Sequence, residues 1–108
     1  MMAIESTRHI VLDLIFVVKR EGSQYSALCL DLDIAACGDT EGQAIDVLKS
    51  LIEDYVMHMA AEGREDQLRR PVSPEALREF LSSSVPKGAS RRFGTYHWHP
   101  EIPAAAAL

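Results

Sequence analysis

Residues 10–18 are hydrophobic except for Asp13, and this nearly continuous apolar run predicts a β-strand over residues 10–20. β-Branched and aromatic side chains dominate the segment, as is typical of strands. One face would carry Ile10, Leu12, Leu14, Phe16 and Val18, and the other Val11, Ile15 and Val17, with Asp13 as its one charged residue. A strand that is apolar on both faces lies inside a sheet or beneath a second layer. We therefore expect a central strand.

Two shorter strands follow in an antiparallel meander. Residues 21–23 predict a hairpin connection, because Gly22 can adopt the positive φ that tight turns need. The second strand is predicted over residues 24–30 and the third over residues 34–37, with a chain reversal at residues 31–33 between them. Connections this short favour strands that are neighbours in one sheet.

A long amphipathic helix is predicted over residues 41–62. Thr40 is placed to cap its first turn, and Gln43 follows three residues later, which is the spacing of a capping box. Gly63 fits the position at which helices end in the left-handed conformation. Apolar residues recur every three or four positions and form one stripe: Ala44, Ile45, Leu48, Leu51, Ile52, Tyr55, Val56 and Met59. We expect this stripe, including Leu51, to be buried against the sheet.

The C-terminal part predicts a short helix and one more strand. Ser73 and Pro74 form a typical helix start, and the helix is expected to end near Ser83. A loop around Pro86 follows, and residues 93–99 alternate weakly, which predicts a strand.

These elements predict one α+β domain over residues 1–100. It would contain a three-stranded antiparallel meander with a long amphipathic helix on one face, a short second helix and a C-terminal strand. Residues 101–108 are expected to be a flexible tail.

Length and composition fit a folded domain, since 47% of the 108 residues are hydrophobic and 25% are charged. The longest apolar stretch, residues 10–18, is too short to span a bilayer. Residues 1–9 contain no apolar run of the signal-peptide type, so we expect a cytoplasmic protein without membrane association. Cys29 and Cys37 are expected to fill core space rather than form a disulfide.

The net charge of −5 is unevenly distributed. Residues 1–61 hold ten acidic and four basic residues, whereas residues 62–108 hold six acidic and seven basic ones. The acidic part repels nucleic-acid phosphates and favours a basic partner. The pairs Arg69–Arg70 and Arg91–Arg92 indicate nucleic-acid contact only weakly, because solvated loop ends explain them as well.

Two sets of side chains could support metal chemistry. A two-metal nuclease needs convergent carboxylates, and the available acids are Asp13, Asp31, Asp33 and Asp39. Turn formation and support of a helix start account for the last three. His97 and His99 could share a metal with Glu101 or His58, but an edge strand whose histidines face solvent is the favoured interpretation. We therefore expect no catalytic residue, metal ligand or cofactor.

The segment over residues 22–63 carries the most specific pattern in the chain. A glycine, a tyrosine and an alanine precede a D-L pair and a G-D-T sequence at the start of the long helix. These positions are Gly22, Tyr25, Ala27, Asp31, Leu32, Gly38, Asp39, Thr40 and Ala44. In order and spacing the pattern resembles the HicB-like antitoxin family.

This resemblance implies a partial ribonuclease-H-like fold, with a further strand beside the first strand of the meander. It also implies a partner, because members of the family typically neutralise HicA, a small basic toxin that cleaves messenger RNA. Many members carry a C-terminal DNA-binding segment. Residues 64–108 lack a second helix to serve as a recognition helix, so direct DNA binding by this chain is not expected.

We expect a non-enzymatic antitoxin of a type II toxin–antitoxin pair, or a solitary relative, that occludes a basic toxin of HicA type. The alternative is a nucleic-acid-associated transcriptional regulator, and a metal-dependent nuclease ranks third. Because one helix covers only one face of a sheet, the second apolar face predicts a homodimer or higher homo-oligomer. The candidate contact residues for an oligomer or another partner are Phe93, Tyr96 and Trp98.

Overall fold

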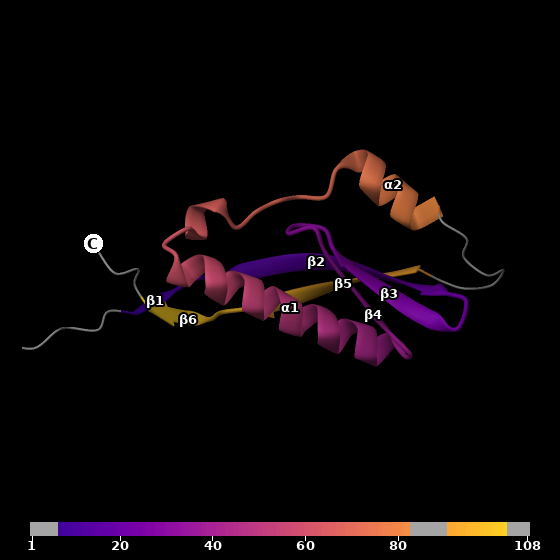
Figure 1. The fold of residues 1–108 in the computed structure, drawn as a ribbon, viewed down its shortest axis with the longest axis horizontal. Coiled ribbons are helices and arrows are strands. Elements are labelled where there is room, and N and C mark those ends of the chain that lie inside the picture. The colour runs from indigo at the N-terminus through magenta and orange to yellow at the C-terminus, as the bar shows by residue number, and fades with distance from the viewer. Residues whose placement is uncertain (1–6, 83–90, 104–108) are drawn as a thin grey trace, which may run out of the picture.

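The computed structural model describes residues 7–82 and 91–103, which form a sheet with helices on both faces (Figure 1). The main sheet is antiparallel, and its strands β2 (Leu12–Glu21), β3 (Gln24–Cys29), β4 (Ile34–Gly38) and β5 (Arg91–Trp98) have the order β4-β3-β2-β5. Helix α1 (Glu41–Ala61) packs on one face. Helix α2 (Pro74–Ser82) contacts a side chain on the other face. The predicted α+β class is confirmed.

Strand β2 is central, as its two apolar faces predict. It pairs with β3 on one side and with β5 on the other, so that Phe16 lies opposite both Cys29 and Gly94. The Phe16 ring packs directly over Gly94, where a Cβ atom would lie 2.5 Å from its Cζ. Gly94 therefore provides the space into which this ring fits.

The connections follow the predicted turn chemistry. Gly22 has a φ of 60° in the β2–β3 hairpin, and Asp33 has a φ of 55° in the turn before β4. Directly after β3, the Leu30 amide donates to the Ile15 carbonyl of β2 over 2.8 Å. The meander is thus held together by short-range connections that the sequence indicates.

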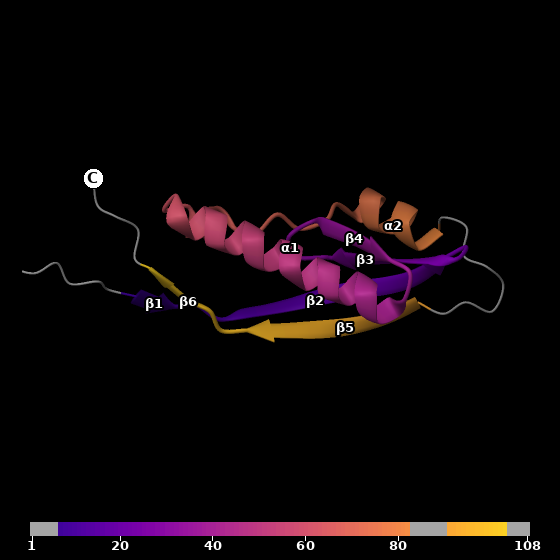
Figure 2. The same ribbon diagram turned by 60° about the horizontal axis from the view of Figure 1, so that its bottom comes forward.

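Two short segments far apart in the sequence, residues 7–9 and 101–103, form a ribbon that the sequence does not indicate. Strands β1 (Thr7–His9) and β6 (Glu101–Pro103) pair antiparallel, beyond one end of the main sheet (Figure 2). The prediction of a flexible tail from residue 101 is therefore wrong for Glu101–Pro103, because a segment more than 90 residues away in sequence provides its hydrogen-bond partners. The rest of the predicted tail and the loop around Pro86 lie outside the described residues.

Helix α1 begins and ends where its capping residues predict. The Gln43 amide donates to Thr40 Oγ1 over 3.0 Å, and the Asp39 amide donates to Gln43 Oε1 over 2.9 Å. Gly63 follows the helix with a φ of 70°. At the N-terminus, a Cβ atom on Gly38 would lie 2.5 Å from the Ala44 nitrogen, so only glycine lets the chain turn this closely into the helix.

The main core lies between α1 and the sheet. The helix contributes Ala44, Leu48, Ile52, Val56, Met59 and Ala60, and the sheet contributes Leu12, Leu14, Val18, Ala27, Cys29 and Ala36. The expectation that Leu51 joins them is wrong, because its side chain is 40% exposed. At about 100° per residue, Leu51 lies at the margin of the row formed by Leu48 and Ile52 and turns away from the sheet. Among the described residues no helix is long and apolar enough to cross a membrane.

Helix α2 covers only part of the second face. It is attached there by Lys19, whose fully buried ammonium group lies 2.5 Å from the Phe80 carbonyl oxygen and 4.4 Å from the centre of the Phe80 ring. Glu21 Oε1 lies 2.6 Å from the same ammonium group and compensates its charge. On this face Val17 and Leu28 are buried, whereas residues farther from Lys19 are not.

Candidate interaction surfaces

The three aromatic residues predicted as contacts occupy two different surfaces. Along β5, side chains alternate between the faces, so Phe93 lies on the second face and Tyr96 and Trp98 lie on the α1 face. Phe93 is 55% exposed. Tyr96 and Trp98 are half-buried against the core and stack on each other with ring centres 6.3 Å apart. Their joint role as a contact site remains a prediction.

Tyr96 is held in place by α1. Its hydroxyl donates to Glu53 Oε2 over 2.7 Å, and the Lys49 ammonium lies 5.0 Å from the ring centre. Burial, followed by the hydrogen bond and the negative charge of Glu53, raises the pKa of Tyr96 to about 12. The neutral phenol therefore links β5 to the helix over the whole physiological pH range.

A first candidate surface is the part of the second face that α2 leaves uncovered, which we call the open half-face. It comprises Val11, Asp13, Ile15, Phe93, Thr95 and His97, all exposed on β5 and on the first part of β2 and its approach. Val11 and Ile15 are 59% and 46% exposed. Exposed branched and aromatic side chains that adjoin one another are typical of an interaction site.

Asp13 and His97 form the polar part of this surface. They are opposite each other on β2 and β5, and His97 Nδ1 lies 2.5 Å from Asp13 Oδ1. Both side chains are exposed. Asp13, for which the sequence alone indicates no role, thus has a hydrogen-bond partner 84 residues later in the chain.

A second candidate surface is the outward side of α1, which we call the α1 ridge. It comprises Asp46, Val47, Ser50, Leu51, Asp54 and Met57, all exposed. The one lysine of the helix, Lys49, points instead toward Tyr96. The ridge therefore combines apolar contact area with two carboxylates. The apolar residues of the ridge lie outside the predicted apolar stripe of the helix or at its margin. Their position relative to that stripe is the feature of the sequence from which their exposure could have been predicted.

The four acidic residues considered for a nuclease are not brought together. Asp31 accepts a hydrogen bond of 2.8 Å from the Ile15 amide and pairs with Arg69 over 3.2 Å. Asp33 occupies a turn, Asp39 precedes α1, and Asp13 lies on the open half-face. Among residues 7–82 and 91–103 there is no group of three or more His, Cys, Asp or Glu side chains that could hold a metal ion.

Three of the four paired arginines contact other parts of the protein. Arg69 pairs with Asp31, Arg70 lies 5.1 Å from the ring centre of Tyr55, and Arg92 forms an ion pair with Glu41. These contacts attach the segment after α1, and strand β5, to the domain. They give the arginines a structural role beside the nucleic-acid contact considered from the sequence.

The cysteines are free and differ in environment. Cys29 is buried on the α1 face, and burial raises the pKa of its thiol. Cys37 lies opposite Ser26 on the second face and is exposed, so the expectation that it fills core space is wrong. Because β4 pairs in the register Cys29↔Ile34, the two thiols point to opposite faces of the sheet.

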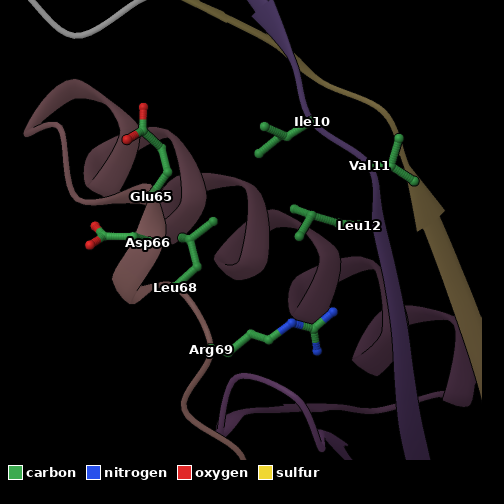
Figure 3. A pocket seen from close by; sticks show the side chains of 7 residues that line it. All are labelled: Ile10, Val11, Leu12, Glu65, Asp66, Leu68 and Arg69. Carbon is green, nitrogen blue, oxygen red and sulfur yellow. The ribbon is translucent and has the colours of Figure 1, made fainter.

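A pocket of about 330 Å³ lies between the approach to β2 and the short 3₁₀ helix η1 (Glu65–Gln67). The side chains of Ile10, Leu12 and Leu68 point toward one another, and the carboxylates of Glu65 and Asp66 point away from them (Figure 3). A ligand site normally contains convergent polar groups. The two acids diverge here and Arg69 is the one basic residue of the lining, so the pocket does not present a convergent set of polar groups.

The open half-face and the α1 ridge are therefore the two candidate binding surfaces of the domain. They lie on opposite sides of the domain, since one belongs to the second face of the sheet and the other to the outer side of the helix that covers the first face.

Comparison of the chain with protein-family models, with curated proteins and with solved structures finds no match.

Proposed function

We propose that this chain is a HicB-like antitoxin, or a solitary relative, that binds a small basic partner through the α1 ridge and occludes its RNA-cleaving surface. The observation that carries the proposal is the ridge itself. Val47, Leu51 and Met57 are exposed on one side of α1, and the exposed carboxylates of Asp46 and Asp54 lie among them. Apolar contacts supply affinity in such an interface, and complementary charge supplies specificity and speed of association.

The arrangement of elements supports the family resemblance and its partial ribonuclease-H-like fold. A three-stranded meander, β2 to β4, precedes one long helix that covers a single face. Strand β5 then lies beside the first strand of the meander, where the resemblance implies a further strand.

The motif residues have structural roles that suit a scaffold. Ala27, Leu32 and Ala44 are fully buried, and Asp31 binds the Ile15 amide. Gly38 occupies a position that a side chain would block. These residues build the sheet and the start of the helix. This structural role supports the proposal that the protein acts by presenting a binding surface.

A binding and cleavage assay tests the proposal. The partner to use is a small basic ribonuclease encoded next to this chain, and its cleavage of messenger RNA is measured with and without an equimolar amount of this protein. We expect a stable complex and inhibited cleavage. Failure of the wild-type protein to bind or inhibit that ribonuclease would refute the antitoxin assignment.

Matched variants test the surface. Leu51→Lys and Asp54→Lys each place a positive charge on the α1 ridge, and each should weaken the complex by at least about tenfold. Glu79→Lys makes the same charge change as Asp54→Lys on exposed α2 and should bind like wild type. Equal binding by all three folded variants would show that the partner uses another surface.

A further inference from the structure

Strand β5 forms an edge of the main sheet along its whole length. It pairs with β2 on one side, and within residues 7–82 and 91–103 no strand of the sheet lies beyond its other side (Figure 2). Helix α1 packs mainly over β4 and β3, toward the opposite margin of the sheet. The edge of β5 is therefore open to a further strand.

Two backbone hydrogen bonds indicate which residues of β5 direct their peptide groups toward this edge. The Ile10 amide donates to the Pro100 carbonyl, in the register that β2 and β5 continue. On the other side of β2, the Leu30 amide donates to the Ile15 carbonyl. Peptide groups alternate in direction along a strand, so the even-numbered residues of β2 bond to the even-numbered residues of β5. The odd-numbered residues of β5 direct their N–H and C=O groups outward: Arg91, Phe93, Thr95 and His97.

This edge lacks the features by which proteins prevent strands from pairing. Such edges are usually short, or carry charged side chains, proline or a bulge. Residues 93–98 contain no lysine, arginine, acidic residue or proline, and they pair with β2 without interruption. The strand at the opposite margin, β4, has only five residues, and Asp33 and Asp39 directly flank it. Antiparallel pairing of two β4 strands about Ala36 would oppose these aspartates, so the edge of β4 is protected and the edge of β5 is not.

The side chains of β5 match a second, antiparallel copy of the same strand about a two-fold axis at Thr95. Thr95 then lies opposite the second copy's Thr95, and Phe93 opposite its His97, all on the open half-face. Threonine pairs and aromatic pairs directly across two strands stabilise a sheet. On the α1 face, the large side chain of Tyr96 lies opposite Gly94. Moving the axis to Gly94 would oppose two residues without side chains, and moving it to Tyr96 would oppose two rings whose hydroxyls already bond to α1.

We propose that two copies of this chain pair β5 with β5, antiparallel about a two-fold axis at Thr95 that is perpendicular to the sheet, and so join two four-stranded sheets into one. The outward groups of residues 93, 95 and 97 then form about six backbone hydrogen bonds between the copies. Neither helix stands between the two edges, since α1 lies toward β4 and α2 leaves Phe93 exposed. A strand of another protein would satisfy the same backbone groups but not the side-chain match. The pairing does not involve the α1 ridge and does not rest on the proposed function.

Sedimentation velocity on the complete chain, without any toxin, tests the proposal. The mass should approach twice the 12.0 kDa of one chain as the protein concentration rises. Thr95→Pro removes one outward N–H group and leaves the hydrogen bonds to β2 in place, so it should raise the dimer dissociation constant at least about tenfold. A wild-type mass of one chain at every concentration, or a folded Thr95→Pro protein that dimerises like wild type, would overturn the proposal.

Thr95→Lys is a second variant that keeps the backbone N–H. It places two lysines opposite each other at the axis and should also weaken the dimer at least about tenfold. Ala35→Lys is its matched control, because it adds the same charge at an exposed position on the β4 edge, and Leu51→Lys adds it on the α1 ridge. Both controls should dimerise like wild type, and circular dichroism checks that each variant is folded. An equal loss in Ala35→Lys and Thr95→Lys would overturn the assignment to the edge of β5.

A cross-link locates the axis. Cys37→Ser first removes the exposed thiol. In this background, Thr95→Cys places two thiols on residues whose Cα atoms lie about 5.5 Å apart across the axis, within the range of a disulfide. Oxidation with diamide should give a covalent dimer on a non-reducing gel, whereas Ala35→Cys in the same background should remain a single chain. A dimer that does not cross-link through Thr95→Cys would overturn the proposed axis.

Discussion

Leu48 and Leu51 provide a direct test of which side of α1 faces the sheet. They are three residues apart on the same helix, and the same substitution to alanine can be made at both. Leu48 is 1% exposed within the core, whereas Leu51 is 40% exposed on the α1 ridge. Their loss of stability should therefore differ for reasons of burial alone, since the change in helix propensity is identical.

The expected magnitudes follow from the buried area. Truncation of leucine to alanine removes three carbon atoms, which at about 0.8 kcal/mol for each buried methylene corresponds to roughly 2.4 kcal/mol at Leu48. The cavity left beneath the helix adds to this, so we expect a loss of about 3–4 kcal/mol. At Leu51 part of the side chain is already in water and no closed cavity forms, so the expected loss is about 1 kcal/mol or less.

Urea unfolding followed by circular dichroism measures both losses. All proteins must be compared at one chain concentration, because self-association, where it occurs, makes the apparent stability depend on concentration. The slope of the free energy against urea should be unchanged, so that differences in midpoint report stability. Equal losses at the two positions, or a larger loss for Leu51→Ala, would show that the helix is rotated relative to the sheet and would refute the assignment of the ridge.

Three further outcomes are expected. Purified protein should cleave neither RNA nor DNA with magnesium or manganese, and specific cleavage that Asp13→Asn abolishes would restore the nuclease hypothesis. The pKa of Tyr96 is about 12 in the folded state and about 10 in the unfolded state. The contribution of Tyr96 to stability should therefore be complete below about pH 10 and be lost between about pH 10 and 12. Absorbance titration of wild type and of Glu53→Gln should show a lower pKa of Tyr96 in the variant. A thiol reagent should modify exposed Cys37 rapidly and buried Cys29 only slowly, and a rapid phase that survives Cys37→Ser would contradict the structure.

Much of the fold could be predicted because its signals are local. Thr40 and Gln43 mark the start of α1, and Gly22 and Gly63 occupy the left-handed conformations that the turn and the helix end require. These residues act on neighbours within a few positions, so their effect is independent of the rest of the chain. The two apolar faces of β2 likewise indicate a central strand before any partner is known.

The candidate surfaces could be predicted only in part. The alternation of β5 already separates Phe93 from Tyr96 and Trp98, because an odd number of positions puts side chains on opposite faces. That signal was present in the sequence, although the three aromatics were predicted as one contact site. The α1 ridge was harder to find, since Leu51 belongs to the helical stripe by spacing and is excluded only by the angle at which α1 meets the sheet.

The sequence by itself determined the order and type of the elements, their caps and turns, and the acidic character of the first 61 residues. Tertiary structure decided the contacts between distant segments: the β1–β6 ribbon, the Asp13–His97 pair and the attachment of α2 by Lys19. The physical reason is the distance along the chain over which each interaction acts. A cap or a turn is satisfied by atoms a few residues away, whereas a paired edge or a shared charge depends on which distant segment the folded sheet brings within hydrogen-bonding distance.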